Sequence, residues 1–188
     1  MAGQIIVIGA SLGGTSVLQY LLSELPENFS KPIAIVQHRA KESTDILVRI
    51  LASRSKLTIK EAEDKECLCC STVYVAPADY HLLVDRGFLA LSIDPPVCFA
   101  RPSIDVLFES AAAAYGINVT GIVLTGGNTD GMRGAQRIKE CGGTVIIQEP
   151  TECVADRLPL SAISTAAFDS ILSSRDIASY LINSGAVP

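Results

Sequence analysis

A serine on a glycine-lined turn follows the first apolar run of the chain. The run spans Ile5–Ile8, and the turn Gly9–Gly14 places Ser11 between small residues. Such neighbours permit a sharp turn from a strand into a helix, which exposes the hydroxyl beside free backbone N–H groups. The pattern is typical of a nucleophile whose oxyanion is held by the turn itself, including Leu12, Gly13 and Gly14. Two other interpretations stay open: Ser11 could only cap the helix, or the turn could bind a phosphate.

A histidine and an aspartate close two further apolar runs. His38 follows Ile33–Gln37, and Asp130 lies in the polar loop after Val119–Leu124. An imidazole can take the serine proton and return it to the leaving group, while a carboxylate orients that imidazole. If the two residues have only structural roles, His38 forms a hydrogen bond with a loop carbonyl and Asp130 caps the next helix. Ser, His and Asp at three strand ends make a hydrolase the leading interpretation.

The elements that must position these residues alternate between strands and helices. Uniformly apolar strands at this spacing predict one doubly wound α/β domain, a mostly parallel sheet with helices on both faces. Its sites form at the carboxyl ends of strands, where Ser11, His38 and Asp130 all fall. A hairpin around Asp85-Arg86-Gly87 is expected as an antiparallel addition, and His81, which begins it, is read as structural. The other predicted strands are Thr58–Glu63, Val73–Ala76 and Thr144–Gln148, and the predicted helices are Thr15–Leu25, Ser43–Ser53, Ile104–Tyr115, Gly131–Cys141 and Arg175–Asn183.

Bulk composition narrows the class further. A length of 188 residues with 48% hydrophobic residues fits a single domain, residues 1–188, with a real core. The net charge of -5 and the lack of a basic run argue against nucleic acid as a partner, and no apolar stretch predicts membrane insertion or a signal peptide. The six cysteines match no usual zinc spacing, so we expect reduced thiols in a cytoplasmic protein and no metal site.

Nucleotide binding is the first rival from another class. The dinucleotide fingerprint places glycine at the centre of the turn, where this chain has Ser11. It also places an acid near the end of the second strand, where this chain has Gln37 and His38. Both differences favour the hydrolase interpretation.

Several separated motifs together make the chain similar to one family. From Ile5 to about Gly185 it resembles the catalytic domain of the chemotaxis protein-glutamate methylesterases. The matching segments are Ile8-Gly9-Ala10-Ser11-x-Gly13-Gly14, Gln37-His38, Glu61-Ala62, Tyr74-Val75-Ala76-Pro77 with His81, Arg101-Pro102-Ser103-Ile104-Asp105-Val106-Leu107-Phe108, Leu124-Thr125-Gly126-x-x-x-Asp130-Gly131, and Gln148 followed by Leu158-Pro159.

This resemblance implies a function and roles for the residues. Ser11 would be the nucleophile, His38 the base and Asp130 the orienting acid, with no metal or organic cofactor. The substrate would be glutamate γ-methyl esters on the cytoplasmic helices of a methyl-accepting chemoreceptor, with methanol as the product and glutamine deamidation by the same steps. Arg101 and the 151–159 loop are candidates for recognising the receptor.

This chain departs from the family pattern at three residues and in its length. Gly127 stands where many members have a methionine that lines the oxyanion region, Leu12 replaces a common threonine, and Leu158 replaces a methionine. Many members also carry a receiver domain ahead of the esterase domain, and this chain begins at the first catalytic strand. We therefore expect a stand-alone member or an excised domain. The alternatives are a receptor-binding module of the same fold with weak catalysis and an esterase for a substrate outside chemotaxis.

Overall fold

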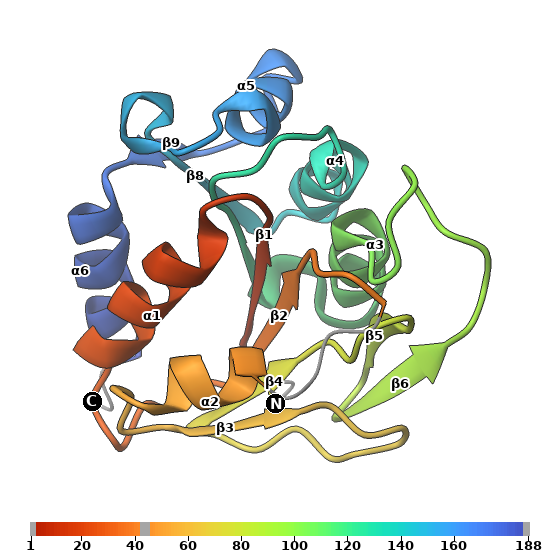
Figure 1. Ribbon diagram of the computed structural model, residues 1–188, viewed down its shortest axis with the longest axis vertical. Helices are drawn as coiled ribbons and strands as arrows, with labels where there is room; N and C mark the ends of the chain where they lie inside the picture. Colours follow the sequence, from red (N-terminus) through yellow and green to blue (C-terminus); the bar gives the residue numbers. More distant parts are fainter. Residues whose placement is uncertain (1–2, 42–45, 186–188) are drawn as a thin grey trace.

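A parallel sheet forms the centre of the molecule. The computed structural model describes residues 3–41 and 46–185. Its seven-stranded sheet has the order β3-β4-β2-β1-β7-β8-β9, and every neighbouring pair is parallel (Figure 1). The central strands are buried on both faces, which is why they read as continuous apolar runs. The strands are β1 Ile5–Ala10, β2 Ile33–Gln37, β3 Thr58–Glu61, β4 Thr72–Val75, β7 Val119–Val123, β8 Thr144–Gln148 and β9 Ser170–Leu172.

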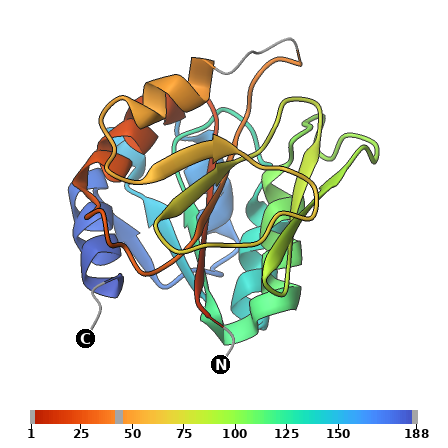
Figure 2. The ribbon, with the colours of Figure 1, turned by 90° about the horizontal axis from the view of Figure 1, so that it is seen from below.

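Helices cover both faces of this sheet. Three of them, α1 (Gly14–Glu24), α2 (Ile46–Ala52) and α6 (Ser174–Ser184), pack on one face. On the opposite face lie α3 (Ile104–Tyr115) and α4 (Met132–Glu140), with α5 (Arg157–Ser164) beside α4 (Figures 1 and 2). Alternate residues of β1 serve the two cores, as the period of a strand requires: Ile5 and Val7 face α3, whereas Ile6 and Ile8 face α1. The doubly wound prediction is confirmed.

The predicted antiparallel hairpin is confirmed, and it stands apart from the main sheet. Strands β5 (His81–Asp85) and β6 (Phe88–Ser92) pair with each other as a separate antiparallel sheet and join none of the seven parallel strands. Its apolar side chains Leu82, Val84 and Leu89 belong to the core on the α3 side of the main sheet. The hairpin is therefore held by this packing and by backbone hydrogen bonds of Leu89 with Lys65 and Glu66, and it does not extend the main ladder.

Two elements near the C-terminus were not predicted. Helix α5 carries Pro159 near its start, which in the sequence reads as a breaker, yet proline is tolerated in the first helical turn. Strand β9 has three half-buried residues at the sheet edge, too few for a visible pattern. Helix α2 is described from Ile46, so the expected cap Ser43 lies outside the described residues. Short 3-10 turns at Gly116–Asn118 and Pro150–Glu152 complete the chain.

The register of the central strands brings three chain segments to one edge. Ala10 of β1 pairs with Gln37 of β2, so Ser11 and His38 follow directly after paired residues. On its other side β1 pairs with β7, whose loop carries Asp130. The chain continues from β1 to β2 on one side of β1, whereas β7 lies on its other side. The carboxyl end of β1 is therefore the topological switch point, where α/β folds form their sites.

Candidate active site

The turn that carries Ser11 is hydrogen-bonded to the loop after β7. The Ser11 N–H donates to the Thr125 carbonyl at 2.9 Å, and the Gly14 N–H donates to the Ser11 carbonyl at 2.9 Å. Gly13 between them has a φ of 83°, a left-handed conformation that favours glycine. A Cβ on Gly126 would lie 2.9 Å from the Cβ of Ser11. The two loops therefore approach as closely as they do because small residues line both.

Gln37 joins the nucleophile segment to the base segment. Its buried side chain donates from Nε2 to the carbonyls of Ser11 at 2.8 Å and His38 at 3.0 Å. The backbone adds a bond from the His38 N–H to the Ala10 carbonyl at 3.0 Å. Sequence reasoning gave Gln37 no role. The signal was its place as the last residue of a buried strand, where a polar side chain must find partners.

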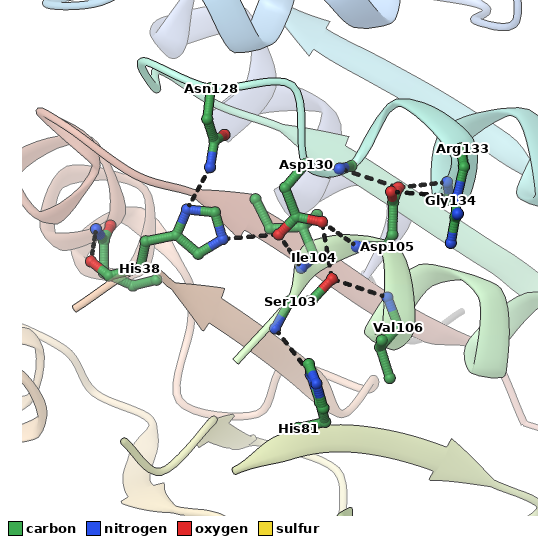
Figure 3. A network of polar contacts seen from close by, with 12 residues as sticks. His38, His81, Ser103, Ile104, Asp105, Val106, Asn128, Asp130, Arg133 and Gly134 are labelled. Carbon is green, nitrogen blue, oxygen red and sulfur yellow. Dashed lines mark hydrogen bonds and ion pairs between the residues drawn. The ribbon is translucent and has the colours of Figure 1, made fainter. Parts of the chain in front are cut away.

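His38 and Asp130 form a direct pair across β1. The Nε2 atom of His38 lies 2.7 Å from Oδ2 of Asp130, whose side chain is fully buried (Figure 3). A carboxylate only accepts hydrogen bonds, so Nε2 carries the proton in the neutral ring. The lone pair then resides on Nδ1, and Nδ1 is the nitrogen that can act as a base.

The carboxylate of Asp130 is held by the start of helix α3. It accepts bonds from the Ser103 hydroxyl at 2.8 Å, the Ile104 N–H at 2.7 Å and the Asp105 N–H at 3.1 Å (Figure 3). Free N–H groups at a helix N-terminus stabilise a negative charge. Asp130 therefore has a capping role, but for α3 and not for the helix that follows it, whose N-cap Gly131 has no side-chain bond.

Asp105 caps the start of helix α4 in the same way that Asp130 caps α3. Its carboxylate accepts from the Gly131 N–H at 3.0 Å and the Gly134 N–H at 2.7 Å (Figure 3). Burial raises the pKa of Asp105, the Gly134 N–H opposes that rise, and the neighbouring Asp130 charge adds to it. Two buried carboxylates thus cap each other's helices, which locks the acid loop to α3. Sequence reasoning missed Asp105, although its place two residues after the helix cap Ser103 is a typical position for an acid.

Asn128 was also missed, and it touches the base. Its Nδ2 atom lies 3.0 Å from Nδ1 of His38 (Figure 3). Within the described residues, the Ser11 hydroxyl forms no hydrogen bond, with His38 or with any other group. The structure therefore brings His38 and Asp130 into contact and places Ser11 at the adjacent strand end.

The remaining predicted residues take distinct places. Within residues 3–41 and 46–185, nothing accepts a hydrogen bond from the Leu12 N–H, and the Leu12 side chain is 63% exposed. A Cβ on Gly127 would have no atom within 4 Å, so the space of the family's methionine is open. His81 is buried, with Nδ1 accepting from the Ser103 N–H and Nε2 3.2 Å from the Pro95 carbonyl. This geometry fits the structural reading of His81.

A hollow beside His38 offers room for a substrate. Its volume is about 530 Å³, and His38 and Asn128 form part of its wall. Arg101 lines it as well and is paired with Asp79 through two bonds to one carboxylate oxygen. The fully exposed ring of Phe99 stands at the same hollow. The base thus faces an open, partly charged space.

A doubly wound sheet with a histidine–aspartate pair at its switch point, beside a serine turn, defines an α/β domain of the hydrolase class. Residues 6–181 match the family model of the CheB methylesterase domain, and the chain belongs to the CheB methylesterase family. The resemblance inferred from the motifs is confirmed, as is the enzyme class.

Relatives and a solved structure agree with this assignment. A protein of Leptospira interrogans is 43% identical over 178 residues, which are 94% of this chain and 92% of that protein. The protein-glutamate methylesterase/protein-glutamine glutaminase of Thermotoga maritima is 37% identical, with 97% of this chain covering 54% of that protein. The crystal structure of the Thermotoga maritima CheB methylesterase catalytic domain matches with a TM-score of 0.94 and 37% identity, over 97% of this chain and 99% of that one.

Proposed function

We propose that this chain hydrolyses glutamate γ-methyl esters on chemoreceptor cytoplasmic helices with a triad of Ser11, His38 and Asp130. The observation that carries the proposal is the His38–Asp130 bond at the strand end beside Ser11, in a chain of the CheB methylesterase family. Deamidation of receptor glutamine would follow the same steps, because only the leaving group differs. The double name of the Thermotoga maritima relative supports including it.

The first step is the activation of Ser11. Nδ1 of His38 takes the hydroxyl proton while the serine oxygen attacks the ester carbonyl. The ring then carries a positive charge, which the ionised Asp130 stabilises through Nε2 at 2.7 Å. Because Asp130 also accepts two N–H bonds from α3, it is already fixed in place before the charge appears.

The negative charge that develops on the substrate oxygen needs donors. The Leu12 N–H, to which no described residue is hydrogen-bonded, lies directly after Ser11 and before Gly13, the N-cap of α1. A helix N-terminus favours a negative charge, so the Leu12 and Gly13 N–H groups are the proposed oxyanion hole. Gly14 supports the turn, because its N–H donates to the Ser11 carbonyl at 2.9 Å. His38 then gives the proton taken from Ser11 to the departing methoxy oxygen, and methanol leaves. Water attacks the acyl-enzyme by the same path and releases free glutamate.

Partner and location follow from the proposed substrate. A methyl ester on the cytoplasmic part of a chemoreceptor is accessible to an enzyme in the cytoplasm, and we place the protein there. In the part of the chain that the structure describes, no helix has the length and apolar character needed to cross a membrane. We infer that the chain is one catalytic domain, and we propose Arg101 and the 151–159 segment as its receptor contacts. Arg101 lines the hollow beside His38, and the Ala155 carbonyl accepts from the Gly126 N–H at 2.8 Å.

The direct test is methanol release from a methylated chemoreceptor cytoplasmic fragment of the same genome. Wild type and Ser11→Ala are compared at equal concentration, with circular dichroism to show that both are folded. Release by wild type alone is the expected result. Equal release by Ser11→Ala would refute Ser11 as nucleophile, and release by neither would refute the substrate.

A further inference from the structure

Both ring nitrogens of His38 are engaged in this structure. Nε2 bonds to Asp130 at 2.7 Å, and Nδ1 lies 3.0 Å from the side-chain nitrogen of Asn128 (Figure 3). A neutral imidazole has one N–H donor and one acceptor nitrogen. Since the Asp130 carboxylate takes the donor, Nδ1 is the acceptor, and the Asn128 amide donates to it. This assignment gives both contacts of the ring one donor and one acceptor.

The Nδ1 atom has a single lone pair, and two groups compete for it. The proposed reaction requires the Ser11 hydroxyl to donate to Nδ1, yet within the described residues that hydroxyl has no hydrogen-bond partner. The Asn128 amide holds the position instead. A bond from Ser11 to the base and a bond from Asn128 to the base therefore exclude each other.

The Asn128 side chain is held by little else. Its Oδ1 atom is buried and has no partner among the described residues. A Cβ on the preceding Gly127 would meet no atom within 4 Å. The contact with His38 is thus the one polar contact of this amide within residues 3–41 and 46–185, and its release requires breaking one hydrogen bond.

We propose that Asn128 is a positioning residue that occupies Nδ1 of His38 in the free enzyme and must leave before Ser11 is activated. This inference rests on the proposed Ser-His-Asp mechanism. Asn128 keeps the base in the neutral form with its proton on Nε2, and it slows the attack of Ser11 until a substrate enters the hollow and displaces the amide. The cost of displacement is that of a neutral hydrogen bond, which corresponds to roughly a 2- to 12-fold lower rate.

Two substitutions of the same residue should act in opposite directions. Asn128→Ala removes the competitor, so a small fluorophosphonate should label Ser11 roughly 2- to 12-fold faster. Asn128→Asp keeps the shape but offers only acceptors, so Nδ1 must carry a proton to meet it. The ring is then a cation between two carboxylates without a lone pair, and labelling near neutral pH should fall by roughly 100-fold or more. A purely structural Asn128 would lower the rate in both variants.

The experiment measures second-order labelling rates for wild type, Asn128→Ala, Asn128→Asp and Ser11→Ala. Asn183→Ala, an exposed position on α6, is the matched control and should label like wild type. Nitrogen-15 spectra of the His38 ring, assigned with His38→Gln, give a second readout. In Asn128→Ala the Nδ1 signal should move toward that of an unbonded acceptor nitrogen, while Nε2 stays protonated.

The outcomes separate this inference from the proposed function. Faster labelling of Asn128→Ala with loss in Asn128→Asp supports the competition. Equal or slower labelling of Asn128→Ala, with Ser11-dependent labelling of wild type, overturns the role of Asn128 and leaves the triad standing. Labelling that does not depend on Ser11 overturns the triad and the inference together.

Discussion

Replacing Asp130 by asparagine removes the charge beside His38 while keeping the shape of the side chain. In wild type, Oδ2 accepts from His38 Nε2 and the Ile104 N–H, and Oδ1 accepts from the Ser103 hydroxyl and the Asp105 N–H. An amide nitrogen at Oδ2 would face two N–H donors. At Oδ1 it would face one, because the Ser103 hydroxyl can turn and accept. The amide oxygen should therefore face His38, and the ring should keep its proton on Nε2.

This geometry sets the expected size of the effect. The reaction loses a hydrogen bond between two charged groups in the transition state, which is about 1.5–3 kcal/mol, or roughly a 10- to 160-fold lower rate. Without the structure, a loss of about 10⁴-fold would be expected, because an amide that faces the ring with its nitrogen forces the wrong tautomer. The unpaired Asp105 N–H should also lower the free energy of unfolding by about 1–3 kcal/mol.

The assay is the steady-state rate of methanol release, with chemical denaturation of the same samples. Asp85→Asn, at the exposed hairpin turn, serves as the control and should leave the rate unchanged. A folded Asp130→Asn protein that loses 10⁴-fold or more would refute the predicted amide orientation. A loss under threefold would refute the role of Asp130 in supporting the charged ring.

Four further predictions concern the surroundings of the site. Gln37→Ala should lower kcat by roughly 10- to 100-fold in a folded protein, because the Ser11 and His38 segments lose their shared donor; an unchanged kcat would contradict this. Asp105→Ala leaves two buried N–H groups of α4 unpaired and should destabilise the protein by about 2–4 kcal/mol in urea unfolding, more than Asp105→Asn does. Burial raises the pKa of the Cys153 thiol to about 11, so mass spectrometry after iodoacetamide treatment at pH 8 should find Cys153 unmodified while the exposed Cys67, Cys69 and Cys70 react. Burial opposes the charge of Asp169, but the bonds from Lys139 and the Val145 N–H outweigh burial and lower the pKa of Asp169 below its ordinary value of 3.8, so the unfolded chain binds this proton more tightly. The stability that Asp169 contributes should therefore be present above pH 3.8 and lost as the pH falls through the lower pKa of the folded state. Asp169→Asn should flatten that part of the pH profile of stability measured by urea unfolding.

Much of the fold could be predicted from local pattern. Helix α3 begins and ends where Ser103 and Gly116 indicated, because a capping hydroxyl and a glycine are strong local signals. The central strands read clearly, since burial on both faces requires continuous apolar residues. Helix α5 and strand β9 did not read clearly. Their sequences are short or carry a proline, and their stability comes from packing on β8 and α4.

The site, like the fold, has some features that follow from local sequence and others that depend on the tertiary structure. The sequence by itself determined which residues could do chemistry and that they would share one sheet edge, because residue type and strand ends are local properties. Only the tertiary structure decided that Asp130 meets Nε2 and not Nδ1, that Asp130 caps α3, and that Asn128 occupies the remaining nitrogen. Those contacts join residues about 25 to 92 positions apart in the chain, and their geometry depends on how α3 and the acid loop pack against β1 and β2. No local pattern carries that information.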